Sequence, residues 1–430
     1  MNDTIYALSS GVGKSGVAVI RISGDDLRGL AAEFIGRNDI TPRRAYFANL
    51  GATDGDLIDQ CIIIYFAAPH SFTGTDIIEI HSHGAPAVIQ RIFSYLSARG
   101  ARMATPGEFS RRAFYNNKMD LADVDALAAL LDARTERQRR AALQSMTGDG
   151  RVYAAWRAQM IEIAAYAAAM TDYADDELPT NIGETCKNRT EKLYNEINDA
   201  LSRYAAVRAV RGGFNITLAG APNVGKSSLF NRIVGENRAI VSDIPGTTRD
   251  VVSAQLDIDG FLVNISDTAG LRDDTTDAIE KIGIEKTNAE IQNADLVIRV
   301  IDQSSEFRVQ SSDNEIIVVN KSDLGCDTRD DVIYTSAKTG AGIDDLMDAI
   351  RAAMHKLMDG AEGALSINTR THELLDAAGG HLDAARGAGD NYDILAENVR
   401  AAADAIGRIL GAISAADVMD ATFSQLCLGK

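Results

Sequence analysis

The sequence predicts a multidomain fold: an α+β domain at the N-terminus, then an all-α domain that an inserted α/β domain interrupts. Three observations support this prediction. The chain has 430 residues, whereas one domain usually has about 150. Short β-like runs give way to helical spacing near residue 119 and to alternating strands and helices near residue 213, and helical spacing returns near residue 358. We therefore expect four segments: 1–118, 119–212, 213–357 and 358–430.

Composition narrows the class of protein. Hydrophobic residues make up 46% and charged residues 24% of the chain, which is typical of a folded soluble protein. No run approaches the ~18 apolar residues of a membrane span, and the first residues lack the basic and apolar regions of a signal peptide. The four cysteines are far apart and form no CxxC pair, which predicts neither a disulfide framework nor a zinc site. We expect a cytoplasmic protein that does not associate with membranes.

The net charge of −18 limits any contact with nucleic acid. A protein that binds RNA mainly by neutralising phosphates is usually basic. If this chain contacts RNA, we expect it to do so through a local patch or through a partner.

The first two segments differ in their hydrophobic spacing. Residues 1–118 contain β-like runs between Gly and Pro turns, which predict an α+β domain. These runs are Val17–Ile22, Cys61–Phe66 and Asp76–Ile80. From residue 119, apolar residues recur at helical spacing, as in Leu121, Val124, Leu127 and Leu131. Gly148-Asp149-Gly150 predicts a break between this helix and the next one.

The third segment alternates strands and helices. Its apolar runs are Phe214–Ala219, Asp295–Ile301, Glu315–Val319 and Val332–Thr335. Runs separated by amphipathic segments predict a mostly parallel sheet that helices cover. Asp259-Gly260 lies between two alternating runs, which predicts a two-residue hairpin and one antiparallel pair.

A phosphate-binding motif follows the first of these strands. Residues 220–228 (GAPNVGKSS) match GxxxxGK[ST]. Glycines let the backbone N–H groups surround phosphates, and the helix N-terminus adds positive potential. Lys226 is expected to contact the β- and γ-phosphates, and the Ser227 hydroxyl to bind Mg²⁺. Gly13-Lys14-Ser15 is rejected as a second such motif, because Leu8 stands at its leading glycine position and no clear strand precedes it.

Four further motifs follow in order. Thr248 lies in a GTTRD loop and is expected to complete the Mg²⁺ shell, and Asp267 begins a DTAG motif near the metal. Asp323 ends an NKSD motif, where a carboxylate can accept two hydrogen bonds from guanine that adenine does not offer. Ser336-Ala337-Lys338 is expected at the guanine O6. The order of these motifs predicts a Ras-like P-loop GTPase domain. The expected GTP contacts are Asn223, Val224, Gly225, Lys226, Ser227, Ser228, Ser242, Asp243, Ile244, Pro245, Gly246, Thr247, Thr248, Asp267, Thr268, Ala269, Gly270, Asn320, Lys321, Asp323, Ser336, Ala337 and Lys338.

Leu271 occupies the position where many small GTPases have a glutamine that orients the attacking water. Its side chain can do no acid–base chemistry. Either this domain hydrolyses GTP poorly or the catalytic group comes from elsewhere.

Motifs along the whole chain carry a family resemblance. They are VIRISG (19–24), SFTG (71–74), PGEFSRRAF (106–114), NKMDL (117–121), the GTPase set and the terminal CLGK (427–430). With these motifs the chain resembles the MnmE (TrmE) family of tRNA-modification GTPases. The resemblance implies an N-terminal domain similar to folate-binding glycine-cleavage T-proteins, a split helical domain and an inserted G domain.

The resemblance also implies partners and a reaction. It implies a homodimer formed through the N-terminal domains, and a heterotetramer with the FAD-dependent protein MnmG, on which FAD and NADH are expected. Together such proteins add a carboxymethylaminomethyl or aminomethyl group to C5 of the wobble uridine (position 34) of certain tRNAs. The one-carbon donor is a 5-formyl- or methylene-tetrahydrofolate. The alternative is a ribosome-assembly or other switch GTPase without modifying activity, which would need a basic KH-like module.

The family's ligand residues map onto particular positions. The resemblance places folate at Arg21, Glu79, Lys118 and Lys430, and Glu79 suits the donors of a pterin while the cations suit carboxylates. From the residues alone, Arg21 and Glu79 could equally be an edge-strand ion pair. The resemblance places K⁺, in the role of an arginine finger, on Asn223, Ser242, Ile244 and Thr247. It also makes Glu280 the catalytic, water-orienting residue, although an apparent extra residue before it leaves Glu285 as the other acidic position.

Three other groups have two interpretations each. His81 and His83 share a strand face, but without a third ligand we favour a structural or folate-adjacent role over a metal site. Cys427 is expected to pack rather than act as a nucleophile. Arg134, Arg137, Arg139 and Arg140 are either a tRNA contact or a solvated helix face.

Overall fold

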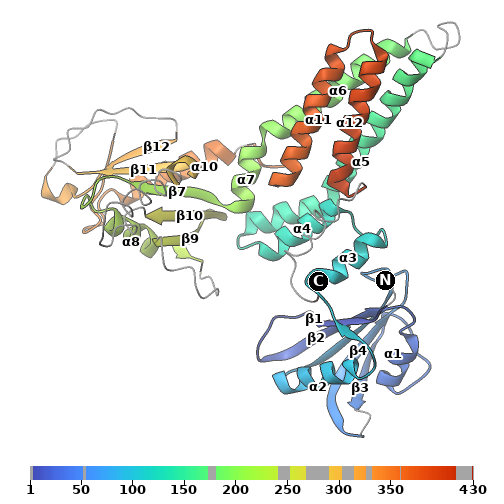
Figure 1. Ribbon diagram of the computed structural model, residues 1–430. Helices are drawn as coiled ribbons and strands as arrows, with labels where there is room; N and C mark the ends of the chain where they lie inside the picture. The colour runs from blue at the N-terminus through green and yellow to red at the C-terminus, as the bar shows by residue number, and fades with distance from the viewer. Residues whose placement is uncertain are drawn as a thin grey trace, which may run out of the picture. The chain divides into compact units, whose positions relative to one another are not determined.

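The computed structural model describes residues 3–51, 55–172, 181–240, 252–267, 290–302, 314–325, 332–358, 360–412 and 429 (Figure 1). The backbone divides into two compact units. The first comprises Met1–Ala128, Gly150–Arg157 and Ile406–Lys430, and the second comprises Ala129–Asp149 and Ala158–Ala405. The bounds of the four expected segments stay a prediction. No helix in the described part of the chain is both long and apolar enough to cross a membrane.

A six-stranded sheet forms the centre of the first unit, in the order β3-β4-β5-β2-β1-β6. The strands are β1 (Ile5–Leu8), β2 (Ser15–Gly24), β3 (Ala45–Gly51), β4 (Leu57–Phe66), β5 (Asp76–Gly84) and β6 (Arg102–Met103). The three β-like runs predicted from the sequence lie in β2, β4 and β5. Helices α1 (Arg28–Ile35) and α2 (Pro86–Ser97) cover one face, where the alternating residues Ile20, Ile22, Ile78 and Ile80 are fully buried.

Helix α3 (Glu108–Tyr115) contributes to a smaller core in this unit. Phe109 packs there with Ile5, Ala7 and Ala104, and Phe72 lies against the cluster. Successive side chains of a strand point to opposite faces of the sheet. The side chains of Ile5 and Ala7 therefore lie on one face, and Tyr6 lies on the other, in the core under α1 and α2.

The segments expected to form the helical domain contain α4 (Leu121–Asp132), α5 (Glu136–Asp172), α6 (Ile182–Ser202), α7 (Tyr204–Gly212), α11 (Thr369–Gly387) and α12 (Tyr392–Leu410). The predicted break at Gly148-Asp149-Gly150 is wrong, because α5, which is 37 residues long in all, runs through these residues without interruption. These residues serve packing instead. A Cβ on Gly150 would lie 2.5 Å from Oδ2 of Asp120. Asp149 accepts hydrogen bonds from the Ser145 hydroxyl at 2.7 Å and the Ser366 amide at 2.8 Å.

The α/β part of the second unit has a seven-stranded sheet in the order β13-β12-β11-β7-β10-β9-β8. The strands are β7 (Phe214–Ala219), β8 (Arg238–Ala239), β9 (Val252–Ile258), β10 (Phe261–Asp267), β11 (Leu296–Ile301), β12 (Glu315–Val319) and β13 (Ile333–Tyr334). The pairs among β7, β10, β11, β12 and β13 are parallel, as predicted. The predicted hairpin is also confirmed: β9 and β10 are antiparallel, and Asp259 and Gly260 have φ of 53° and 81°, as a type I′ turn requires.

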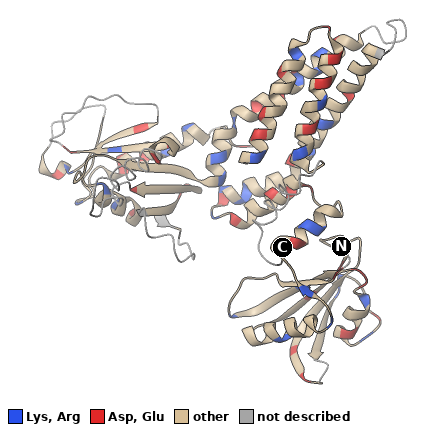
Figure 2. Ribbon diagram, viewed as in Figure 1, with Lys and Arg blue, Asp and Glu red and all other residues tan. Residues whose placement is uncertain are grey.

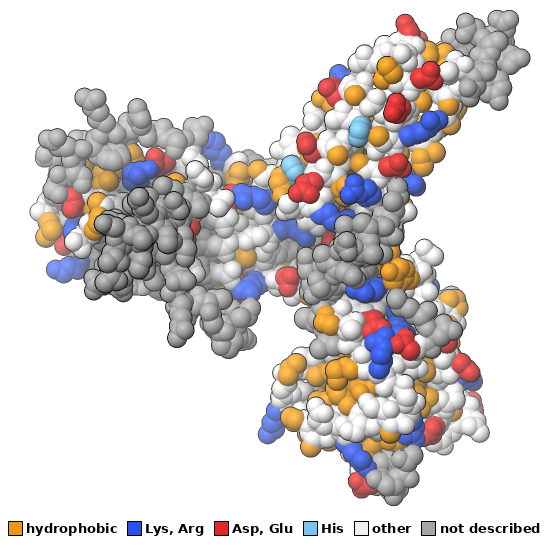
Figure 3. Space-filling model, viewed as in Figure 1, with side chains coloured by type: hydrophobic (Ala, Val, Ile, Leu, Met, Phe, Trp, Pro, Cys, Tyr) orange, Lys and Arg blue, Asp and Glu red, His pale blue; other side chains and the backbone are white. Residues whose placement is uncertain are grey.

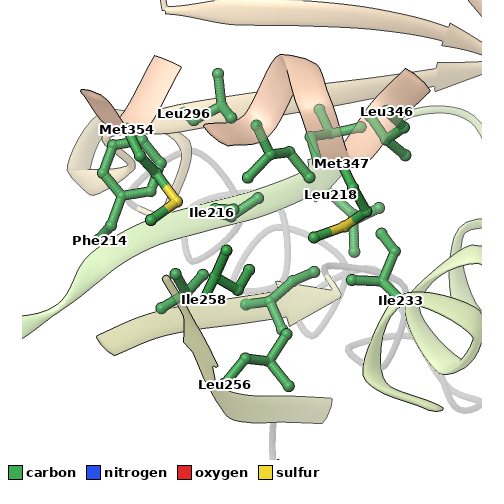
Figure 4. Packing of buried hydrophobic residues seen from close by; sticks show 14 of the residues in the cluster. Phe214, Ile216, Leu218, Ile233, Leu256, Ile258, Leu296, Leu346, Met347 and Met354 are labelled. Carbon is green, nitrogen blue, oxygen red and sulfur yellow. The ribbon is translucent and has the colours of Figure 1, made fainter. Parts of the chain in front are cut away.

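Helices α8 (Lys226–Glu236) and α10 (Ile343–Met358) bury the apolar side chains of this sheet. Figure 4 shows Ile216 and Leu218 of β7 packed with Met347 and Met354 of α10, with Ile233 of α8 nearby. This core buries the side chains of β7, which leads directly into the loop before α8.

The rejected motif Gly13-Lys14-Ser15 connects two strands. β1 ends at Leu8 and Ser15 begins β2, so no helix follows the glycine. Its rejection as a phosphate loop is therefore right. The reason that no strand precedes it was wrong, because β1 does.

Candidate functional site

The loop between β7 and α8 has backbone conformations that need glycine at two positions. Gly220 has φ of 147° and Gly225 has φ of 97°. A Cβ at Gly220 would collide with the carbonyl oxygen of Val300, and one at Gly225 with the side-chain amide of Asn320. Asn223 also has a left-handed φ, of 64°. The loop therefore wraps closely around the start of α8, as a phosphate-binding loop does.

Lys226 is buried at the first residue of α8, with 6% of its surface exposed. Its Nζ donates hydrogen bonds to the carbonyl oxygens of Gly220 and Ala221, both at 2.9 Å. The ammonium is thus held over the loop, where the α8 N-terminus adds positive potential. Together they form a site for an anionic group.

A hydroxyl and a carboxylate meet beside this loop. Ser227 Oγ donates to Oδ2 of Asp267 at 2.6 Å, and Asp267 is only 1% exposed. The contact forms because β10 lies next to β7 in parallel, with Asp267 paired to Leu218. Hydroxyl and carboxylate oxygens are ligands that Mg²⁺ prefers. Among the described residues, no three His, Cys, Asp or Glu side chains form a metal-binding group, so a metal here would depend on Ser227 as well.

Asn320 joins the predicted base-reading residues to the phosphate loop. It is 2% exposed, and its Nδ2 donates to the carbonyl oxygens of Val224 at 3.0 Å and Gly225 at 3.4 Å. Its Oδ1 accepts from the amide of Ala337 at 3.2 Å. Next to it, Lys321 Nζ donates to the carbonyl oxygen of Asn223 at 2.7 Å.

Asp323 lies on the exposed 3-10 turn Ser322–Leu324. Its Oδ1 accepts a hydrogen bond from the Ser336 hydroxyl at 2.7 Å, and the Ser322 amide donates to the carbonyl oxygen of Thr335. The structure therefore brings three predicted motifs together, since Asn320 and Asp323 connect the NKSD segment to both the SAK segment and the loop before α8.

Ser228 lies in α8 and Lys338 in the turn after β13, and the other residues named from the sequence for this site fall outside the described part of the chain. They are Ser242, Asp243, Ile244, Pro245, Gly246, Thr247, Thr248, Thr268, Ala269, Gly270, Leu271, Glu280 and Glu285. Cys427 and Lys430 also lie outside it.

A second cluster is centred on Arg21 of β2 and Glu79 of β5, which are direct cross-strand partners. Oε1 of Glu79 accepts from Nε of Arg21 at 3.1 Å and from Nη2 at 2.9 Å. The guanidinium lies 5.4 Å from the ring centre of Phe72 and 5.8 Å from that of Phe109. The two side chains do form an ion pair. The edge-strand description was wrong, however, because β2 and β5 are interior strands.

The chain end reaches the same cluster. The carbonyl oxygen of Gly429 accepts hydrogen bonds from Nη1 of Arg21 at 3.3 Å and from the Ser9 hydroxyl at 2.9 Å. No pattern in the sequence pointed to Ser9, which lies 420 residues from Gly429.

Lys118 lies against the 71–75 loop that also contacts Arg21. A Cβ on Gly74, whose φ is 79°, would lie 3.3 Å from Cε of Lys118. Asn116 Nδ2 fixes this contact by donating to the carbonyl oxygen of Thr73 at 2.6 Å. Three of the four predicted folate residues, Arg21, Glu79 and Lys118, thus contact one another or this loop.

The histidines and arginines singled out from the sequence have separate partners. His81 Nε2 lies 3.4 Å from Oε2 of Glu79, and His83 Nδ1 lies 2.8 Å from Oδ1 of Asp59. Arg139 and Arg140 pair with Glu136, whereas Arg137 stacks on Phe261 at 3.9 Å and Arg134 donates to Gln255. Two of the four arginines therefore contact the β9–β10 hairpin. Figure 2 shows acidic and basic residues interleaved along α5, α6, α11 and α12.

Two family models and several related proteins match this chain. Residues 4–118 match the family model "GTP-binding protein TrmE N-terminus", and residues 121–427 match "MnmE helical domain". The tRNA modification GTPase MnmE of Parvibaculum lavamentivorans is 40% identical over 100% of both chains. The proteins of the same name from Roseobacter denitrificans and Brucella anthropi are 37% and 38% identical, covering 100% of this chain and 100% and 99% of theirs. The chain therefore belongs to the MnmE (TrmE) family of tRNA modification GTPases.

Proposed function

We propose that this protein is a GTP hydrolase that modifies tRNA in the cytoplasm, with residues 213–357 as its G domain. The main supporting observation is that Asn320 joins the guanine-reading NKSD segment to the loop around Lys226. A nucleotide held at both ends must then present guanine and phosphates in one fixed geometry. Asp323 would accept the guanine hydrogen bonds, and Lys226 would exchange its two carbonyl partners for phosphate oxygens.

Two cations belong to this proposal. Ser227 and Thr248 would hold Mg²⁺, and the short contact between Ser227 and Asp267 supports it because both supply hard oxygen ligands. Asn223, Ser242, Ile244 and Thr247 would hold K⁺. A cation among the phosphates stabilises the charge that develops in hydrolysis. Glu280 would orient the attacking water.

A reduced folate is the proposed ligand of the Arg21 cluster, through Arg21, Glu79, Lys118 and Lys430. The half-buried carboxylate of Glu79 suits the N–H donors of a pterin, and the aromatic rings of Phe72 and Phe109 lie under the guanidinium of Arg21. The folate, as 5-formyl- or methylene-tetrahydrofolate, would supply one carbon for C5 of the wobble uridine. The MnmG partner, carrying FAD and NADH, would join the protein as a heterotetramer in this reaction.

The proposed homodimer has support in the sheet face that carries Arg21. Phe47, Ile62, His81 and Val19 form one row across β3, β4, β5 and β2. Phe47 is 71% and Ile62 43% exposed, and Figure 3 shows hydrophobic side chains gathered on this unit. A second copy that covered such a row would bury apolar surface beside the proposed folate site.

Nucleoside analysis of tRNA from cells that lack the protein tests the proposal. We expect the wobble modification to disappear, and to return with the wild-type gene but not with an Asp323→Asn gene. Unchanged nucleosides together with a ribosome-assembly defect would instead favour the alternative switch GTPase. That alternative needs an α+β RNA-binding module, whereas the described residues 360–412 contain only α11 and α12 as regular elements.

A further inference from the structure

Ser9 and Gly429 meet beside Arg21 although they lie at opposite ends of the chain. Both the Ser9 hydroxyl and Nη1 of Arg21 donate to the carbonyl oxygen of Gly429, at 2.9 and 3.3 Å. Gly429 is buried. One backbone carbonyl thus receives two side-chain donors from the N-terminal sheet.

The contact leaves no room for a side chain at residue 429. Gly429 has φ of 93°. A Cβ there would lie 2.8 Å from Cα of Ser9 and would collide with the carbonyl oxygen of Leu8. The two backbone segments therefore pack directly on each other.

Hydrogen bonds fix the position from which Ser9 donates. The Ser9 amide donates to the carbonyl oxygen of Val19 at 2.7 Å, and the Val19 amide donates to Oγ of Ser10 at 3.1 Å. Ser9 is therefore tied to β2 rather than placed freely in the glycine-rich connection that follows it.

Arg21 donates hydrogen bonds to two acceptors. Its Nε and Nη2 donate to Glu79, and its Nη1 donates to the carbonyl oxygen of Gly429. A carboxylate ligand at Arg21 would compete for that donor, because a charged acceptor binds a guanidinium more strongly than a neutral carbonyl does. The Ser9 hydroxyl would then be the remaining side-chain donor on Gly429.

We propose that Ser9 is a positioning residue, which holds the Gly429 carbonyl and so keeps this part of the chain at the Arg21 site while a ligand occupies Arg21. Lys430 follows Gly429 directly in the chain. The inference rests on the proposed function, because folate binding at Arg21 and Lys430 is itself a proposal.

The first test measures docking of the chain end without any ligand. Carboxypeptidase B removes a C-terminal lysine, and its rate on the full chain reports how often the contact of Gly429 with Ser9 and Arg21 opens. Ser9→Ala should raise this rate by about two- to tenfold, the range expected for the loss of one hydrogen bond. Ser9→Thr retains the hydroxyl and should keep the wild-type rate. Ser97→Ala is the control, because it removes a hydrogen bond elsewhere in this unit, between the hydroxyls of Ser97 and Tyr6 at 2.6 Å, and should leave the rate unchanged.

The second test measures 5-formyl-tetrahydrofolate affinity by calorimetry. Ser9→Ala should weaken binding by about two- to tenfold in the full chain, whereas Ser9→Thr and Ser97→Ala should bind folate like the wild type. A loss of the same size in Ser97→Ala would overturn the proposal, as would unchanged folate binding or an unchanged carboxypeptidase rate in Ser9→Ala. If the wild-type chain binds no folate but Ser9→Ala still accelerates lysine release, the folate assignment fails and the docking role of Ser9 stands.

Discussion

Single side chains connect the two parts of the proposed GTP site. Asn320 directs its amide to the loop before α8 and its carbonyl oxygen to Ala337, so it is structural, whereas Asp323 is exposed and oriented by Ser336. Within one motif, Asn320 therefore holds the site together, and Asp323 is the residue proposed to contact the base.

Asp323→Asn should weaken GTP binding by at least about tenfold, because charge-assisted hydrogen bonds contribute roughly 1.5–3 kcal/mol each. Titration with a fluorescent GTP analogue measures this. Asp348→Asn, which changes an exposed carboxylate paired with Arg351 on α10, is the control and should bind normally. Equal affinity of both variants would show that Asp323 does not read guanine.

Side chains of the PGEFSRRAF motif (106–114) have a structural role in the first unit. Glu108 is 5% exposed and accepts hydrogen bonds from Arg102 at 2.9 Å, from Arg112 at 3.3 Å and from the Thr105 amide at 2.9 Å. Burial alone would raise its pKa, but the hydrogen bonds from Arg102 and Thr105 outweigh burial and lower the pKa to about 2. Arg112 also donates to Asp3, so this network fixes the start of the chain to α3.

This network predicts a pH dependence. A depressed carboxyl pKa adds stability above the unfolded-state pKa of about 4.5, and that stability is lost as the pH falls toward 2. Glu108→Gln should therefore lower the free energy of unfolding by roughly 3 kcal/mol at pH 7, and the difference from wild type should shrink below about pH 4.5. Denaturant titrations at several pH values measure this. Glu136 also has a pKa lowered to about 2, by hydrogen bonds from Arg139 and Arg140, but it is exposed to solvent. Glu136→Gln should therefore have a much smaller effect.

Helix α5 shows that contacts with distant residues can override a local signal for a helix break. Two glycines and an aspartate favour a break, and a mid-helix glycine costs about 1 kcal/mol relative to alanine. The break does not occur, because Asp149 is bonded to Ser145 and Ser366 and because Asp120 occupies the space beside Gly150. Asp120 belongs to the N-terminus of α4, where its Oδ1 accepts from the Asp123 amide at 2.8 Å.

The two glycines of α5 should respond differently to alanine. A Cβ added to Gly148 would have no atom within 4 Å, so Gly148→Ala should stabilise the protein by about 0.5–1 kcal/mol. Gly150→Ala gains the same helix propensity but displaces the Asp120 carboxylate and weakens the α4 cap. It should therefore be less stable than Gly148→Ala by about 1–2 kcal/mol. Thermal unfolding of both variants measures the difference, and equal stabilities would show that Asp120 moves aside freely.

Some features could be predicted from the sequence for a physical reason. A phosphate loop needs its glycines, lysine and serine within a short stretch of chain, so the motif around Lys226 predicts its own structure, and turn chemistry does the same for Asp259-Gly260. The stacking of Arg137 on Phe261 and the contact of Ser9 with Gly429 join distant segments. The local spacing of these residues does not predict either contact, because tertiary packing determines which distant segments meet.

The two proposed chemical functions lie in separate parts of the sequence. Removal of residues 427–430 should leave GTP hydrolysis nearly unchanged but abolish folate binding, because Gly429 contacts the Arg21 cluster and Lys430 is proposed to complete it. Phosphate release and calorimetry on the same preparation measure both. Normal folate binding by the truncated chain would contradict the ligand assignment.

The proposed K⁺ site predicts a kinetic signature of the complete enzyme. Because Leu271 cannot orient water, replacement of K⁺ by Na⁺ should lower kcat much more than GTP affinity, since the ion acts on transition-state charge. Glu280→Ala should lower kcat by roughly 10²-fold and preserve GTP binding. Glu285→Ala is the control. If Glu285→Ala were inactive and Glu280→Ala active, Glu285 would be the water-orienting residue. Full K⁺-stimulated turnover in both variants would refute the mechanism.

The unbroken course of α5 also limits how this protein can change in length. One residue added within the helix turns everything beyond it by about 100°, so the buried faces before and after the insertion would no longer match. Seven added residues return to within about 20° of the original direction and lengthen the helix by about 10 Å. Tolerated insertions in α5 should therefore have lengths close to a whole number of turns, such as about 7, 11 or 18 residues, whereas surface loops accept any number.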